Sequence, residues 1–192
     1  MLKIRIFYFL SLTTVFFYAQ QDKLSIDAER SFYSNWDAYF SYNLITAIDH
    51  SESLIYFASN NSIFSFNTIS NQIEKFDTLN GLSGDEISAL YHSEINNIIA
   101  IGYETGLIQI IDLNSDSIIN IYDILNKPTI PSNKKTINSF FQNDDELLVS
   151  TGYGISNYSL NGYEFGDTYY IGDFATQINV TSTAIHQNFI YA

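Results

Sequence analysis

The sequence repeats one pattern of short apolar segments, and this repeat limits the possible folds more than any other feature. Each unit opens with an apolar segment, turns through polar residues, and continues into a second and a third apolar segment separated by a turn-forming stretch. The complete units open at Ile45, Ile87 and Ile137, which are 42 and then 50 residues apart, and a further unit begins near Val180. A four-stranded module that recurs every ~40–50 residues is typical of a β-propeller blade.

The segments within each unit have the length and residue types of β-strands. Residues 54–58 show no alternation of apolar and polar residues, as expected for a strand that is covered on both faces. The chain contains fifteen Tyr and fifteen Phe but only two Pro, which favours pleated, half-buried surfaces. We therefore predict an all-β protein whose middle strands are more buried than its outer strands. The expected second and third strands are 54–58 and 63–66, 98–102 and 107–111, and 147–149 and 155–158, and fourth strands are expected near 73–76 and 118–122.

The last unit is incomplete in this sequence, because residues 189–192 fall within its second expected strand. A ring opened after about three blades would leave apolar faces in water, at a cost of ~1.5–3 kcal/mol for each large side chain. The predicted fold is therefore the N-terminal part of a β-propeller, with three four-stranded blades and the start of a fourth in residues 45–192. We expect the missing blades of the same propeller to be its first partner.

Residues 1–19 have the features of a secretory signal peptide. Two basic residues, Lys3 and Arg5, precede the almost wholly apolar residues 6–18, and a cleavage point follows Ala19. The apolar run is short for a membrane span, and a lipid anchor would need a cysteine, which the chain lacks. We expect an exported protein, either associated with the cell surface and outer membrane or periplasmic.

Residues 20–44 precede the first unit and include an aromatic-dense segment at 32–42. One interpretation is a strand that pairs with the last blade and closes the ring, which would remove free sheet edges. The alternative is an aromatic platform that binds carbohydrate. Because the segment shows neither a repeated pattern nor a charged partner, we favour the ring-closing strand.

The acidic charge of the chain argues against nucleic acid as a partner. The formal net charge is −13, and it becomes −15 when residues 1–19 are left out. A surface of this sign repels phosphate backbones. The absence of cysteine also excludes disulfides, cysteine-ligated zinc and cysteine nucleophiles.

The three histidines occupy matching places in the repeat. His50 and His92 each begin the tripeptide His-Ser-Glu, and His186 lies in the corresponding turn of the last unit. Three histidines suggest a zinc site, but each belongs to a different blade, and equivalent turns of neighbouring blades should be too far apart to share one ion. We interpret the three histidines as residues that recur at equivalent turns of the repeat and do not bind metal.

Asp112, Asn114 and Asp116 are spaced like the first ligands of a calcium loop. The sixth position is Ser117 rather than the required Gly, the twelfth is Asp123 rather than Glu, and no helix is expected on either side. This segment should link the third and fourth strands of the second unit. A polar turn is therefore the favoured interpretation.

The sequence has no nucleophile elbow, P-loop or His-Glu-x-x-His motif. We predict that the protein is not an enzyme, needs no cofactor, and has no residue that can be assigned as catalytic, cofactor-binding or metal-binding. The longer spacing before the third unit comes from an insertion at 125–135, which contains Pro128 and Pro131. We expect this insertion to form a loop on one rim.

Two stretches resemble known propeller families. The turn Asn-Gly-Leu-Ser at 80–83, with the strands and turn that follow it at 87–107, resembles the blade motif of two-component-regulator propellers. The aromatic entry at 36–43, placed after a signal peptide, is similar to the start of PorZ-like proteins of the type IX secretion machinery of Bacteroidetes. The resemblance covers most of residues 30–192. It implies a non-enzymatic surface protein with two propellers and a C-terminal domain, which supplies anionic lipopolysaccharide to the sortase that anchors secreted cargo.

Two other classes of function compete with this interpretation. The first is the periplasmic sensory propeller of a hybrid two-component receptor, which would bind an oligosaccharide. The second is a propeller hydrolase or lyase, which would need acids or histidines that converge at the channel mouth. No such arrangement is visible in the repeat, so we rank the scaffold first and the receptor second.

Overall fold

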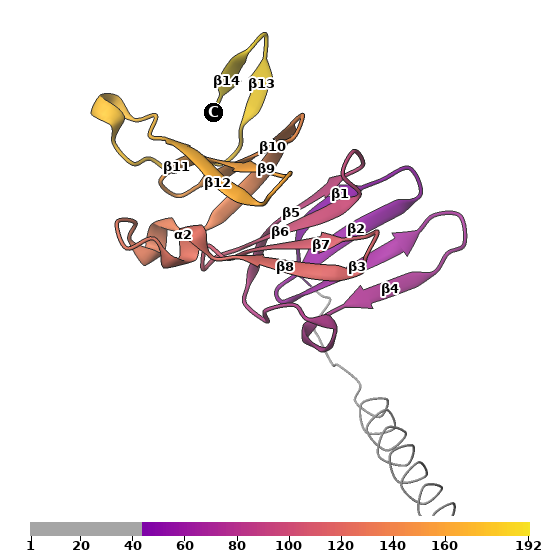
Figure 1. Ribbon diagram of the computed structural model, residues 1–192. Coiled ribbons are helices and arrows are strands. Elements are labelled where there is room, and N and C mark those ends of the chain that lie inside the picture. The colour runs from indigo at the N-terminus through magenta and orange to yellow at the C-terminus, as the bar shows by residue number, and fades with distance from the viewer. Residues whose placement is uncertain (1–43) are drawn as a thin grey trace, which may run out of the picture. The chain divides into compact units, whose positions relative to one another are not determined.

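The computed structural model describes residues 44–192, which form four separate antiparallel sheets (Figure 1). Three sheets have four strands each, every strand pairing with the next one in sequence, and the last sheet is a two-stranded hairpin. Such meanders are the blades of a β-propeller. The predicted all-β fold, with three complete blades and the start of a fourth, is therefore confirmed. The expected signal peptide at 1–19 and closing strand at 32–42 lie outside the described residues.

The strands follow the predicted order. The first blade contains β1 (Ile45–His50), β2 (Leu54–Ser59), β3 (Ser62–Asn67) and β4 (Ile73–Phe76). The second blade contains β5 (Ile87–Ser93), β6 (Ile98–Tyr103), β7 (Ile108–Asp112) and β8 (Ser117–Ile121). The third blade contains β9 (Ile137–Asn143), β10 (Glu146–Thr151), β11 (Gly154–Ser159) and β12 (Glu164–Tyr169), and the hairpin contains β13 (Ala184–His186) and β14 (Phe189–Tyr191).

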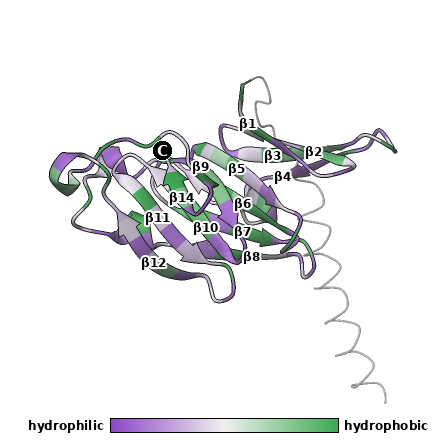
Figure 2. Ribbon diagram, turned by 90° about the horizontal axis from the view of Figure 1, so that it is seen from above, coloured by the Kyte–Doolittle hydropathy of each residue, from purple (hydrophilic) through white to green (hydrophobic). Residues whose placement is uncertain are grey.

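The middle strands of the second blade are covered on both faces by neighbouring blades. All six residues of β6 are buried, whereas β8 has a single buried residue and the fourth strands of the other two blades are mostly exposed. Along β6, Ile99 and Ile101 join the core shared with the first blade, while Ile98 and Ala100 join the core shared with the third blade. Successive side chains of a strand point to opposite faces, so both faces must be apolar. This explains why the β6 sequence is apolar without interruption. The neighbouring strand β7 is also largely hydrophobic (Figure 2).

The first strand of each blade carries a β-bulge at the same place. The register shifts between Ile45 and Ala47, and it shifts at the equivalent point of β5 and of β9. In the second blade the bulged residue is Ser88, whose hydroxyl donates to the carbonyl of Ile137 in the third blade at 2.7 Å. The bulge therefore aims a polar side chain at the next blade and connects the two sheets.

The turn at 80–83 is anchored by a buried glutamine of the second blade. The Gln109 side chain is 2% exposed; its Oε1 accepts the backbone N–H of Ser83 and the hydroxyl of Tyr103, and its Nε2 donates to the carbonyl of Gly81. Gly81 has a φ of 104°, which a residue with a side chain rarely adopts. The Asn-Gly-Leu-Ser turn thus connects the first blade to the second. Two of its backbone polar groups form hydrogen bonds with a buried side chain of the second blade.

The insertion at 125–135 is more regular than predicted. The sequence suggested a loop, but the chain forms a short helix, α2 (Asp123–Asn126), and a 3-10 turn at Ser132–Lys134. The segment still connects β8 to β9 without a strand, as the predicted loop would. Ile124 and Ile130 are buried in the core between the second and third blades. One apolar side chain before the prolines and one between them therefore hold the segment against the sheets.

Replacing Gly102 by alanine should destabilise the packing of the second blade against the third. A Cβ at this position would lie 2.6 Å from the Cβ of Ile137, which is part of a rigid strand and cannot move aside cheaply. Overpacking of this kind costs about 1–3 kcal/mol. The free energy of unfolding of the full-length protein, measured by denaturant titration, should fall by that amount. The matched control is Gly162→Ala, where the nearest atom would be 3.5 Å away; equal effects of both variants would contradict this account of the interface.

The stability of the fold should decrease in alkaline solution. Burial raises the pKa of the Tyr103 phenol to about 12, whereas an unfolded tyrosine titrates near 10. Between these values the unfolded chain loses a proton that the folded chain retains, so stability should drop from pH 10 upwards, by on the order of 2 kcal/mol for this group. Unfolding measured from pH 8 to pH 12 should show a shallower decline in Tyr103→Phe. If stability declined equally steeply with pH in Tyr103→Phe, the Tyr103 phenol would not be the cause of the decline.

Candidate functional site

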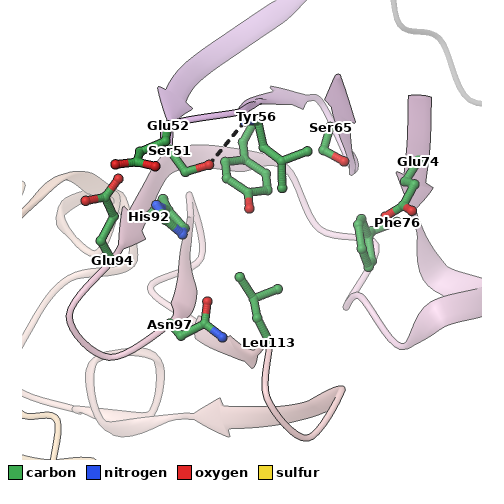
Figure 3. Close-up of a pocket in the computed structure, with 11 residues that line it drawn as sticks. Ser51, Glu52, Tyr56, Ser65, Glu74, Phe76, His92, Glu94, Asn97 and Leu113 are labelled. Atoms are coloured by element: carbon green, nitrogen blue, oxygen red, sulfur yellow. Dashed lines mark hydrogen bonds between the residues drawn. The ribbon is translucent and has the colours of Figure 1, made fainter. Parts of the chain in front are cut away.

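A cleft lies between the first and second blades, at the ends of strands that come from both. It encloses about 410 Å³ and is lined by residues of the β1–β2 hairpin, of β2 and of β4 on one side, and of the β5–β6 hairpin on the other. Figure 3 shows the main lining side chains in the cleft. Six of them determine its chemistry: Glu52, Tyr56, Glu74, Phe76, His92 and Glu94.

The cleft is acidic. Glu52, Glu74 and Glu94 line it, and all three side chains are exposed to solvent. No lysine or arginine is among the lining residues. In Figure 3, Glu52 and Glu94 stand at one end of the cleft, and Glu74 stands beside Phe76 at the other. Three carboxylates without a basic residue give this concave surface a negative potential.

His92 forms the floor of the cleft on the side of the second blade. Its side chain is only 9% exposed, and its ring stacks on Tyr56 with centroids 5.1 Å apart. Its backbone N–H donates to Oδ2 of Asp49 at 2.6 Å, which joins the two blades. The imidazole Nδ1 is buried and has no hydrogen-bond partner among the residues that the structure describes.

Tyr56 presents a neutral phenol to this cleft. Burial is the main cause that raises the pKa of its phenol, and the negative charges of Glu74 and Asp49 raise it further. A phenol with a raised pKa stays protonated at neutral pH. Its ring and hydroxyl are therefore uncharged groups beside the carboxylates of the cleft.

The cleft exists because one hairpin is shorter than its counterpart. Four residues separate His50 from its strand partner Ile55, whereas six separate the equivalent His92 from Ile99. The longer hairpin of the second blade includes Asn96, which has no counterpart in the first blade. The space between the first and second blades therefore lacks a side chain that the next interface has.

The next interface shows what the missing side chain does. Gln142 of the third blade is equivalent to His92, since each sits at the same register position of its first strand. Its Nε2 donates to Oδ1 of Asn96 at 2.6 Å, and its Oε1 accepts the hydroxyl of Tyr91 at 3.4 Å. The Gln142 side chain is thus fully hydrogen-bonded between the second and third blades, whereas Nδ1 of the equivalent His92 has no partner within residues 44–192.

The histidines of the repeat do not form a site together. His50 is mostly exposed and lies 3.8 Å from the carboxylate of Asp49, His92 is buried between blades, and His186 ends β13. Within residues 44–192, no group of three or more histidine or carboxylate side chains is placed to hold a metal ion. The sequence analysis missed that the glutamates of the two His-Ser-Glu tripeptides line one cleft. Their identical position in adjacent units was the available signal.

The segment from Asp112 to Asp116 is a polar turn between β7 and β8, as predicted. Oδ1 of Asp112 accepts the backbone N–H of Asn114 at 2.8 Å, and this bond is the main cause that lowers the pKa of the Asp112 carboxyl. Asp116 adopts a φ of 53°, which the short polar side chain tolerates in a tight turn. Of the oxygens spaced like calcium ligands, that of Asp112 therefore stabilises the turn, and Oδ1 of Asn114 accepts the side-chain N–H of Asn97 at 2.8 Å.

A second depression of about 560 Å³ lies beside α2 and is lined by residues of β8 and by Tyr163. It brings no further histidine or glutamate together. Over the described range 44–192, no helix is both long and apolar enough to cross a membrane. Fold and site together define the class of this protein as a β-propeller with an acidic cleft between adjacent blades.

The family follows from comparison with known proteins. The model of the N-terminal β-propeller domain of PorZ, from the type IX secretion system, matches residues 55–192, so the chain belongs to this family. No curated protein matches the sequence. The solved structures that share the fold include PorZ of Porphyromonas gingivalis, described as an essential surface component of the type IX secretion system, and Sqt1 of Saccharomyces cerevisiae.

Sequence identity to both structures is low, so they support the fold alone. PorZ is 19% identical with a TM-score of 0.63, over 70% of this chain and 18% of the PorZ chain. Sqt1 is 15% identical with a TM-score of 0.63, over 80% of this chain and 45% of its own. The chain therefore corresponds to less than one fifth of the PorZ structure that it matches.

Replacing Asp49 by alanine should loosen the interface at the cleft. The substitution removes the carboxylate that accepts the backbone N–H of His92, and a buried donor without a partner costs about 1–3 kcal/mol. The expected result is a lower midpoint of thermal unfolding and faster hydrogen exchange at the His92 amide. Asp85→Ala, at an exposed carboxylate on the connection before β5, is the control and should change neither measurement. Unchanged exchange in Asp49→Ala would show that this bond does not hold the blades together.

Proposed function

We propose that this protein is a non-enzymatic, exported scaffold of the type IX secretion machinery, which presents anionic lipopolysaccharide to the cell-surface sortase. The observation that carries the proposal is the match of the PorZ N-terminal propeller model to residues 55–192. A component of this machinery belongs to the cell envelope, and we place the protein at the cell surface or outer membrane.

The make-up of the described blades favours a scaffold over an enzyme. The buried polar groups serve connections between blades, as Gln109 and Ser88 do. No residue of a catalytic motif falls among the described residues that line the cleft, and the Ser51 hydroxyl that lines it accepts the backbone N–H of Leu54. Blades that are covered on both faces form a rigid support on which partners can assemble.

The distribution of positive charge supports an anionic ligand outside the cleft. Residues 44–192 contain four basic side chains, and three of them, Lys127, Lys134 and Lys135, lie in or beside the insertion between the second and third blades. Lys134 and Lys135 are half-buried and donate to backbone carbonyls at 3.2 and 2.6 Å, which fixes their ammonium groups in place. Phosphate or carboxylate groups of a lipopolysaccharide would be attracted to this segment and repelled by the cleft.

The proposal can be tested by deleting the gene and following secreted cargo. Without the protein, cargo should be released into the medium instead of being anchored, and it should lack attached lipopolysaccharide. Complementation with the wild-type gene should restore both. The purified protein should also retain anionic lipopolysaccharide from a detergent extract of the envelope.

Normal anchoring and normal lipopolysaccharide attachment in the deletion strain would overturn the proposal. If the deletion instead abolished the transcriptional response to one polysaccharide, the sensory propeller of a two-component receptor would be the better assignment.

A further inference from the structure

We propose that the cleft between the first and second blades binds an arginine side chain presented by a partner protein. This site is separate from any site for anionic lipopolysaccharide, and the inference does not depend on the proposed function. It rests on the charge of the cleft, its stacked rings and the unsatisfied imidazole at its floor.

The charge of the cleft selects a cation. Glu52, Glu94 and Glu74 line one concave surface, and no basic residue lines it with them. Some acidic side chains of the described residues are paired within turns, as the Asp112 carboxylate is with the backbone N–H of Asn114. The three glutamates have no such hydrogen bond within residues 44–192. Carboxylates held around a concave surface attract a positive group and repel an anionic glycan.

The rings of the cleft favour guanidinium over ammonium. Tyr56 and His92 form a stacked pair with an interplanar angle of 27°, and Phe76 lines the same space. A planar guanidinium stacks on aromatic faces and donates in a fork to carboxylates, whereas an ammonium is a strongly hydrated point charge. Guanidinium is also a group that proteins carry and saccharides generally do not. The occupant is therefore a peptide segment with an arginine.

The floor of the cleft lacks a hydrogen-bond partner that its counterpart has. At the next interface Gln142 bonds to Asn96 and Tyr91, while Nδ1 of His92 is buried without a partner within the described residues. Because buried polar groups are nearly always satisfied, an orphan atom on a residue that lines the cleft indicates a missing partner, which Nδ1 would reach when the His92 ring turns toward the cleft. A guanidinium has five N–H donors, enough for two carboxylates and the imidazole. The volume of about 410 Å³ admits a long side chain and lies within the range of ligand pockets.

The experiment uses two matched peptides and the full-length protein. The probes are acetyl-Gly-Ser-Arg-Ser-Gly-amide and the same peptide with citrulline, which keeps the shape of arginine but carries no charge. The protein is labelled with ¹³C at the histidine rings, and the His92 signal is assigned from its loss in His92→Gln. The arginine peptide should shift this signal saturably, and raising the salt from about 0.1 M to about 1 M should weaken binding. The citrulline peptide should bind at least about tenfold more weakly.

Two double variants separate the cleft from the general acidity of the surface. The double variant Glu52→Gln with Glu94→Gln should bind the arginine peptide about tenfold more weakly, because two of the three charges are removed without a change in side-chain size. Glu104→Gln with Glu164→Gln removes two exposed charges outside the cleft and should leave the affinity unchanged. Thermal unfolding of both variants verifies that they fold. If the first pair did not fold, Glu94→Gln alone would serve the same comparison.

Three results would overturn the inference. Equal binding of the arginine and citrulline peptides would show that charge is not recognised. An unchanged affinity in the Glu52 and Glu94 double variant would place the peptide elsewhere. A shift of the His92 signal by anionic lipopolysaccharide, with none by the arginine peptide, would assign the cleft to the glycan instead. None of these results bears on cargo anchoring in the deletion strain, so the two proposals fail independently.

Discussion

The fold depends on one constraint: a middle strand that is apolar on both faces, as β6 is, needs a neighbouring sheet on each side. In the second blade, Ile99 and Ile101 of β6 are covered by the first blade, and Ile98 and Ala100 are covered by the third. The hydrophobic effect therefore acts between sheets more than within them. Polar groups at the interfaces, such as Ser88 and Gln109, set the relative position of sheets that apolar packing alone would leave free to slide.

The cleft is the place where this packing is incomplete. The first blade carries a bulky Tyr56 where the second blade has Ala100, and its hairpin lacks the counterpart of Asn96. His92 therefore stacks on a ring, while its equivalent Gln142 is held in a hydrogen-bonded network. A repeat fold can create a binding site in this way without a new element, because a change of two residues in one hairpin opens a gap that neighbouring blades otherwise close.

The positive charge of the described chain is concentrated in one segment. Three of the four basic side chains in residues 44–192, Lys127, Lys134 and Lys135, lie between the second and third blades. The acidic side chains are spread over all the blades, and three of them line the cleft between the first two. Groups of opposite sign on one rigid support can bind two ligands of opposite charge without competition.

The repeat by itself determined the all-β fold and the order of the strands, because short apolar segments at fixed spacing leave few alternatives. It also indicated that the segment from Asp112 to Asp116 is a turn. Only the tertiary structure decided that the insertion after β8 folds back on Ile124 and Ile130, and that Glu52 and Glu94 line a common cleft. The physical reason is that strand patterns are local, whereas the distance between equivalent turns depends on how closely two whole sheets pack and on the length of each hairpin.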